Sequence, residues 1–137
     1  MIILPVNLCP CGSHKKFKDC CLPYLKGEKV LDDETPEYVV RSRFSCAVVG
    51  DGAYMLKTWH KDFRPDLDAK DLGQQMLEHN FISLEIVSVE LDESKTNARI
   101  EFYANFKVKR NAGYLHELGS FVKENGIWYY TDGIMLD

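Results

Sequence analysis

Thirteen residues near the N-terminus, CPCGSHKKFKDCC at positions 9–21, hold four of the five cysteines of this 137-residue chain. Four thiolates so close together can surround one zinc ion if the loop between the two cysteine pairs turns back, and Gly12 and Ser13 favour such a turn. A module of about 25 residues buries too little apolar surface to fold alone, and metal binding would supply on the order of 10 kcal/mol. The spacing therefore predicts a small module held together by zinc.

Three other roles for the cysteines fit less well. The vicinal pair Cys20-Cys21 would form a strained disulfide ring. A thioredoxin-like redox site needs Cys-x-x-Cys, whereas this chain has Cys-x-Cys. The cysteine ligands of an iron–sulfur cluster are usually more widely spaced along the chain. His14 is a candidate substitute ligand, although a surface position in the loop is the simpler interpretation. Cys46 lies in a predicted helix and is interpreted as a buried, small apolar side chain.

Charge is unevenly distributed along the chain. Residues 1–31 carry a balance of +3, which leaves −7 for the other residues of a chain with a net charge of −4. An acidic body argues against nucleic acid as the main partner, because phosphate neutralisation needs a broad basic face. The small basic module, with Lys15, Lys16 and Lys18, is instead a candidate surface for an acidic partner.

The sequence also predicts the compartment. No apolar run is long enough to span a bilayer, and the start MIILPVN lacks the basic region and the apolar length of a signal peptide. We therefore expect a protein that does not cross a membrane and that lies in the cytoplasm, where structural disulfides are disfavoured.

The rest of the chain is predicted to form helices followed by strands. After a polar connector at 22–34, capping residues and terminating Gly50 and Asn80 indicate helices at about 36–49, 52–60 and 68–79. From Phe81 onward the apolar residues alternate with period two, which is typical of half-buried strands.

Four strands are predicted, at about 81–91, 100–108, 114–124 and 127–131. The apolar phase flips at Ile86-Val87, which indicates a β-bulge, and Asn125-Gly126 indicates a two-residue hairpin turn. This turn sets a register in which Phe121 faces Tyr130, and Gly119 faces Asp132. The predicted fold class is α+β: a small zinc knot at residues 1–31, then a domain at 32–137 whose three N-terminal helices pack on a curved antiparallel sheet of about four strands.

Two known families are similar to this sequence. CPCGSHKKFKDCC resembles the SEC-C motif, the zinc-binding knot of the SecA translocation ATPase, and it departs from the common pattern at His14, where glycine is usual. The segments RSRFSCAVVGD (41–51), TWHKDFRPD (58–66), EFYANFK (101–107) and HELGSFVKENGIWYYTDG (116–133) resemble the YchJ-like family. Members of that family join a SEC-C motif to a nuclear transport factor two-like (NTF2-like) cone, in which helices lie on a curved sheet and leave a pocket between them.

These resemblances imply a ligand set and a kind of partner. The SEC-C motif makes Cys9, Cys11, Cys20 and Cys21 the zinc ligands. The related knot of SecA contacts the acidic chaperone SecB and phospholipid, so the resemblance implies an acidic protein partner that contacts Lys15, Lys16 and Lys18.

The predicted cone pocket has its own candidate residues: Arg41, Arg43, Trp59, His60, Glu117, Phe121, Trp128, Tyr130 and Asp132. Paired with Glu117, an arginine of the first long helix could hold an anionic ligand, but it could equally fix the helix on the sheet, which is the preferred interpretation. His60 could act as a general base at the mouth of the pocket or be an ordinary edge residue. Asp132 could enter the cone or cap the end of the hairpin.

Neither a Ser/His/Asp set nor a phosphate-binding loop stands out. The leading hypothesis is a zinc-binding, non-catalytic protein-interaction module whose cone supports the knot or binds a small ligand. The alternative is a small-molecule enzyme of the isomerase, dehydratase or hydrolase type with its site in the cone. Redox sensing through the cysteine cluster is a third hypothesis.

Overall fold

The computed structural model describes residues 7–137, so the apolar start of the chain at residues 1–6 lies outside the described residues. A short 3-10 turn, η1 (Phe17–Asp19), precedes four helices: α1 (Leu22–Leu25), α2 (Glu37–Val49), α3 (Gly52–Lys57) and α4 (Ala69–His79). The strands follow: β1 (Phe81–Leu91), β2 (Asn97–Val108), β3 (Asn111–Glu124) and β4 (Ile127–Met135).

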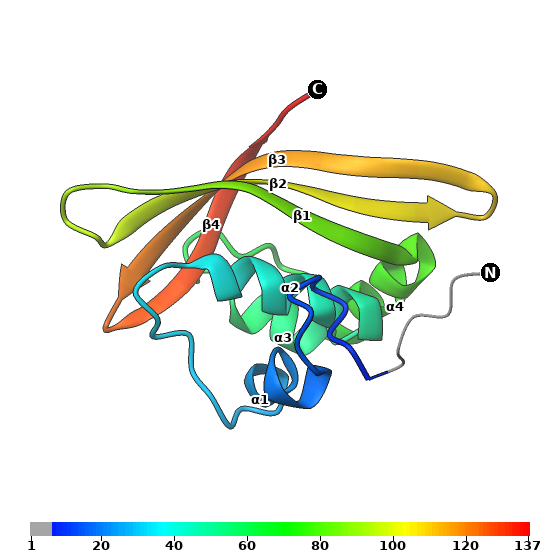
Figure 1. Cartoon of the computed structure of the whole chain (residues 1–137), viewed down its shortest axis with the longest axis horizontal. Coiled ribbons are helices and arrows are strands. Elements are labelled where there is room, and N and C mark those ends of the chain that lie inside the picture. The colour runs from blue at the N-terminus through cyan, green and yellow to red at the C-terminus, as the bar shows by residue number, and fades with distance from the viewer. Residues whose placement is uncertain (1–6) are drawn as a thin grey trace.

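The molecule has two main layers, and the chain order explains them. The strands pair antiparallel in the order β1-β2-β3-β4, so each strand lies beside its neighbour in sequence. Figure 1 shows α2, α3 and α4 on one side of this curved sheet, with α1 on the side of the helices away from the sheet. The N-terminal loop lies against α2 and reaches β1, where Leu84 packs on the cysteines. The predicted α+β class is confirmed. No helix in residues 7–137 is long and apolar enough to cross a membrane.

Local capping chemistry places most helix ends where the sequence predicts them. The side chains of Asp51 and Asp68 accept hydrogen bonds from the backbone N–H groups of Tyr54 and Asp71, and so begin α3 and α4. Gly50 ends α2 in the left-handed conformation that glycine adopts at little cost.

Two helix predictions need correction. The segment 22–34, predicted as a connector, contains the one-turn helix α1. The second predicted helix ends at Lys57 rather than at about His60, because the following residues pair with β4. The N–H of Tyr130 donates to the carbonyl of Thr58, and the N–H of His60 donates to the carbonyl of Tyr130. A long-range pairing thus ends the helix, and no local signal announces it.

The sheet register is predicted correctly on one side of an irregularity and wrongly on the other. Phe121 faces Tyr130, and the bulge predicted near Ile86 is present between Ile86 and Ser88. Another irregularity, between Gly119 and Phe121, shifts the register by one residue, so that Gly119 faces Gly133 instead of Asp132. Because side chains alternate along a strand, this shift leaves Asp132 exposed.

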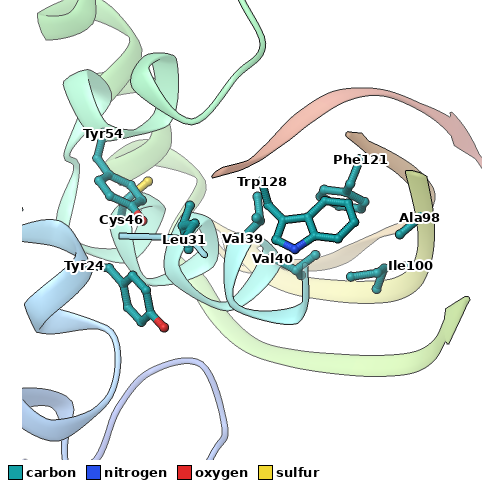
Figure 2. Packing of buried hydrophobic residues seen from close by; sticks show 10 residues of the cluster. All are labelled: Tyr24, Leu31, Val39, Val40, Cys46, Tyr54, Ala98, Ile100, Phe121 and Trp128. Atoms are coloured by element: carbon teal, nitrogen blue, oxygen red, sulfur yellow. The ribbon is translucent and has the colours of Figure 1, made fainter. Parts of the chain in front are cut away.

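The core lies between α2 and the concave face of the sheet. Figure 2 shows Trp128 beside Val39 and Val40 of α2, in one cluster with Phe121 of β3 and Ile100 of β2. Trp128 is completely buried, and its indole Nε1 donates a 2.8 Å hydrogen bond to the carbonyl of Asp33 in the segment before α2. This side chain therefore ties the sheet, the helix layer and the connector together.

Candidate metal centre and cone cavity

The loop that carries the cysteines folds back on itself through backbone contacts. The N–H of Cys9 donates to the carbonyl of Lys15 at 2.8 Å, and the N–H of Phe17 donates to that of Asn7 at 2.8 Å. Between these contacts Gly12 and His14 have φ values of 83° and 69°. A histidine in the left-handed region costs on the order of 1 kcal/mol, which gives a physical reason for the glycine usual at this position of the motif.

This loop brings the four predicted ligands together. The sulfur atoms of Cys9, Cys11, Cys20 and Cys21 all lie within 4.8 Å of one another, and each of these residues is at most 5% exposed. The Cys11 and Cys20 sulfurs are 3.6 Å apart. All five cysteines of the chain lie within the described residues and are free thiols. The arrangement is a compact, buried, all-sulfur site that could hold a metal ion.

The thiols strongly influence one another's ionisation. Hydrogen bonds from the thiols of Cys21 and Cys9 lower the pKa of Cys11, whereas the hydrogen bonds with Cys11 and Cys9 raise the pKa of Cys21. Once one sulfur is a thiolate, the others in the group resist a further negative charge. Four thiolates at this spacing therefore need a cation among them.

One face of α2 supplies polar groups to this cluster. Tyr38, Arg41 and Ser45 are three and four residues apart, so they share a helical face. The Tyr38 hydroxyl lies 3.3 Å from the Cys20 sulfur, and the Ser45 hydroxyl lies 3.5 Å from the Cys9 sulfur. Tyr38 and Ser45 were not predicted as part of the site. Their spacing of three and four residues from Arg41 would have placed them on the same helical face as that arginine.

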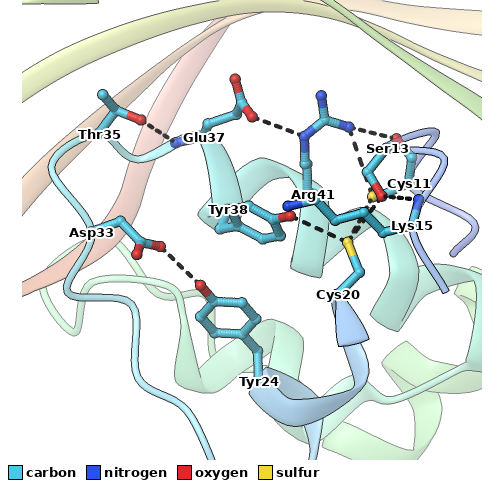
Figure 3. A network of polar contacts seen from close by, with 10 residues as sticks. All are labelled: Cys11, Ser13, Lys15, Cys20, Tyr24, Asp33, Thr35, Glu37, Tyr38 and Arg41. Carbon is cyan, nitrogen blue, oxygen red and sulfur yellow. Dashed lines mark hydrogen bonds and ion pairs between the residues drawn. The ribbon is translucent and has the colours of Figure 1, made fainter. Parts of the chain in front are cut away.

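Arg41 belongs to this cluster and not to the cone pocket, which corrects its predicted place. Its Nη1 donates a 2.9 Å hydrogen bond to the carbonyl of Cys11 and lies 3.7 Å from the Cys11 sulfur. Its Nε donates to Glu37 at 3.0 Å (Figure 3). A guanidinium beside an all-thiolate site partly offsets the negative charge there.

The surface of the knot is basic, as predicted. Lys15, Lys16 and Lys18 are all exposed, as is His14 between the cysteine pairs. The Lys15 ammonium lies 5.9 Å from the centre of the Tyr38 ring, within range of a cation–π interaction. His14 is not needed as a metal ligand, because the four sulfurs already provide four ligands.

A cavity of about 280 Å³ lies between α2 and the sheet. Its wall includes five of the nine residues predicted for the cone pocket: Arg43, Trp59, Glu117, Phe121 and Tyr130. The rest of the wall is mainly apolar, with side chains from α2, α3 and all four strands. The sequence indicated those strand residues as one apolar face but did not connect them with a site.

The polar end of this cavity is built by stacking. The Arg43 guanidinium lies 4.5 Å from the Tyr130 ring centre and 5.0 Å from that of Trp59. The Tyr130 hydroxyl donates a 2.7 Å hydrogen bond to Oε2 of Glu117. The expected direct pair between an arginine and Glu117 is replaced by this arrangement, in which tyrosine lies between the two charges.

Four of the predicted pocket residues lie elsewhere. Arg41 contacts the cysteine cluster, Trp128 is packed in the core, and Asp132 is exposed. His60 pairs through Nε2 with Glu124 and lines a separate, open groove. The turn of the chain that pairs residues 58–60 with β4 separates His60 from Glu117, so these two groups do not cooperate in one site.

Glu117 should make stability depend on pH. Burial raises the pKa of Glu117 despite the opposing effects of Tyr130 and Arg43, and Asp132 also raises it. A carboxyl with a raised folded-state pKa contributes stability below its unfolded pKa and loses it as pH rises through the folded value. Glu117→Gln should therefore increase the free energy of unfolding near pH 8 by on the order of 1 kcal/mol, and by much less near pH 4.

Urea denaturation at the two pH values measures this effect. Glu85→Gln, at an exposed position of β1, removes the same charge and should show little difference between them. An equal effect of Glu117→Gln at both pH values would contradict the assignment of a raised pKa to Glu117.

Comparisons with known proteins agree with this geometry. The SEC-C motif model matches residues 7–23, and the model of the YchJ middle NTF2-like domain matches residues 35–133. A UPF0225 protein of Photorhabdus laumondii is 33% identical over 130 residues, which cover 93% of this chain and 80% of that protein.

Two solved structures have a similar fold across nearly the whole chain. A SEC-C motif containing protein from Rhodopseudomonas palustris has a TM-score of 0.82 at 28% identity, covering 94% of this chain and 98% of that one. A SEC-C motif containing protein from Psychrobacter arcticus has a TM-score of 0.80 at 28% identity, covering 96% of this chain and 84% of that one. This chain therefore belongs to the YchJ-like family, with a SEC-C motif that precedes an NTF2-like domain.

Proposed function

We propose that this protein binds one structural zinc ion through Cys9, Cys11, Cys20 and Cys21, and that the knot docks onto an acidic protein without catalysing a reaction. The observation that carries the proposal is the set of four buried sulfurs within 4.8 Å of one another. In this proposal residues 1–31 form the zinc-binding unit and residues 32–137 form the cone that supports it.

The spacing of the sulfurs supports a single zinc ion. Zinc–sulfur bonds of about 2.3 Å in a tetrahedron require sulfurs about 3.8 Å apart. The 3.6 Å separation of Cys11 and Cys20 matches this value, and all the sulfurs lie within 4.8 Å of one another, so changes of about 1 Å or less in their separations would complete the tetrahedron. Four protein ligands leave no open coordination position, which is typical of a structural rather than a catalytic zinc site. A reducing compartment such as the cytoplasm would keep the thiols available.

The surface around the site supports an acidic partner. Lys15, Lys16 and Lys18 are exposed on the loop that encloses the cysteines, while the remainder of the chain is acidic. Rigid positioning of the loop by a metal ion would hold these lysines in one arrangement and reduce the entropy lost on binding.

The cone cavity provides some support for the alternative, an enzyme. Glu117 is buried at its wall, but His60 and Asp132 lie outside it. The cavity therefore has one carboxyl and no histidine among its wall residues, which suits ligand binding better than general acid–base catalysis.

Metal analysis and partner capture test the proposal together. Purified wild-type protein should contain one zinc ion per chain, and Cys20→Ser/Cys21→Ser should contain none. Cys46→Ala is the matched control and should retain the metal, because Cys46 lies outside the cluster. A metal-free wild type, or equal metal content in all three proteins, would refute the zinc site.

Charge reversal tests the docking surface. Lys15→Glu/Lys16→Glu/Lys18→Glu should reduce retention on an immobilised acidic protein such as SecB by at least about tenfold. A matched variant, Lys95→Glu/Lys107→Glu/Lys109→Glu, makes the same change in net charge at exposed positions of β2 and of the turns that flank it. Equal losses in the two variants would show an effect of net charge alone and would count against the knot as the docking surface.

A further inference from the structure

Arg43 uses only part of its hydrogen-bonding capacity within the protein. Its Nη1 donates to the carbonyl of Met55 at 2.8 Å and to Oγ1 of Thr58 at 2.9 Å. These two bonds fix the guanidinium at the C-terminal end of α3. Among residues 7–137, neither Nε nor Nη2 of Arg43 has a hydrogen-bond partner.

These two nitrogens belong to a side chain of the cavity wall and are not sealed from the surface. No side-chain nitrogen or oxygen of the described residues is both sealed from the surface and without a partner. Arg43 is part of the cavity wall and keeps part of its surface accessible. The Nε and Nη2 groups are therefore accessible and not sealed, and they form the side-on edge of the guanidinium, whose two parallel N–H bonds match a carboxylate.

The guanidinium also lacks an anion in direct contact. Within the described part of the chain, no carboxylate oxygen lies within 4.0 Å of Arg43. Glu117, on the same cavity wall, receives its hydrogen bond from Tyr130, and burial raises the pKa of its carboxyl toward the neutral form. Arginine stays protonated at all physiological pH values, so this half-buried positive charge has an unused site for an anion.

We propose that the cone cavity binds a small monocarboxylic acid with an apolar body, whose carboxylate pairs side-on with Nε and Nη2 of Arg43. The cavity volume of about 280 Å³ lies near the lower end of ligand-binding cavities and sets the size of the ligand. Apolar and aromatic side chains of the wall contact its body: Phe44, Phe81, Leu84, Phe102 and Leu115.

The chemistry of the wall excludes other ligands of similar size. An amine would place a second positive charge beside Arg43 and is repelled. A neutral amide has only one acceptor atom and cannot use both N–H groups in the same way. A phosphate dianion brings more charge than one guanidinium compensates in an apolar cavity. This proposal does not depend on the metal centre, because none of the cysteines in the cluster lines the cavity.

NMR titration of the ¹⁵N-labelled full chain tests the proposal with matched probes. The acids are benzoate, phenylacetate, 3-phenylpropanoate and hexanoate, and each is paired with its amide and with the amine of the same carbon skeleton. At least one acid should bind saturably, with shifts at residues of the cavity wall, and at least about tenfold more tightly than its amide and amine. The proposal is overturned if no acid binds, if the amide or amine binds equally well, or if the shifts lie elsewhere.

Three variants make the result specific. Arg43→Gln should weaken acid binding at least about tenfold, whereas Arg99→Gln, at an exposed position on β2, should leave it unchanged. Ala104→Leu fills the cavity from β2 while leaving Arg43 in place, and it should abolish binding without unfolding the protein. Unchanged acid binding in Arg43→Gln or in a folded Ala104→Leu variant would overturn the proposal. If Arg43→Gln is unstable, Ala104→Leu still tests the proposal.

Discussion

The proposed zinc site predicts that removal of the metal lowers the midpoint of thermal unfolding by about 10 °C. A structural zinc site can contribute on the order of 10 kcal/mol to a small module. The loss in this chain should be smaller, on the order of 4 kcal/mol, because α2 contacts the knot and free thiols can be buried once protonated. At roughly 2–4 °C for each kcal/mol, this gives the expected shift.

Calorimetry before and after treatment with a strong chelator measures this effect, and addition of zinc should restore the original midpoint. Cys11→Ser should show the low midpoint without chelator, since Cys11 is completely buried among the other sulfurs. Cys46→Ala should respond to the chelator as the wild type does. Identical midpoints with and without chelator would show that the metal does not stabilise the fold.

The second large effect concerns Trp128. Replacement by alanine should reduce the free energy of unfolding by about 3–5 kcal/mol, the usual range for a fully buried aromatic side chain. Trp128 has no exposed surface, and its Nε1 bonds to the carbonyl of Asp33. The loss would therefore loosen the contact between β4 and the segment that leads into α2.

Urea denaturation of three variants separates the two contributions of Trp128. Trp128→Phe keeps much of the packing but removes the indole hydrogen bond to the Asp33 carbonyl, which then keeps only Lys123 Nζ as a donor. This variant should cost about 1–3 kcal/mol. Tyr114→Ala, a similar truncation at a position that is 55% exposed, should cost less than about 1 kcal/mol. If Trp128→Ala cost no more than Tyr114→Ala, the core would not depend on this residue.

The two arginines of α2 show what sequence patterns can and cannot assign. Positions 41 and 43 are about 200° apart around a helix, so their side chains must point to different sides. That argument is available from the sequence, and it already excludes a shared site. Only packing shows that Arg41 faces the cysteine cluster and Arg43 faces the cavity.

Asp132 and His60 failed as pocket residues for a related reason. The register shift between Gly119 and Phe121 was not predicted, because the apolar run at 127–130 shows no clear change of phase before the exposed end of β4. The pairing of residues 58–60 with β4 joins segments about seventy residues apart in sequence. Contacts at such distances depend on the relative positions of whole layers, which no short pattern encodes.

The sequence by itself determined the cysteine cluster, the α+β class, most helix ends and the hairpin register near Asn125-Gly126. These features depend on groups a few residues apart, whose chemistry acts wherever the segment lies. The tertiary structure alone decided which face of α2 meets the knot, which side chains surround the cavity, and which nitrogens of Arg43 remain accessible. Those outcomes depend on how the sheet and the helices pack, because only packing brings distant side chains together and seals some of them from water.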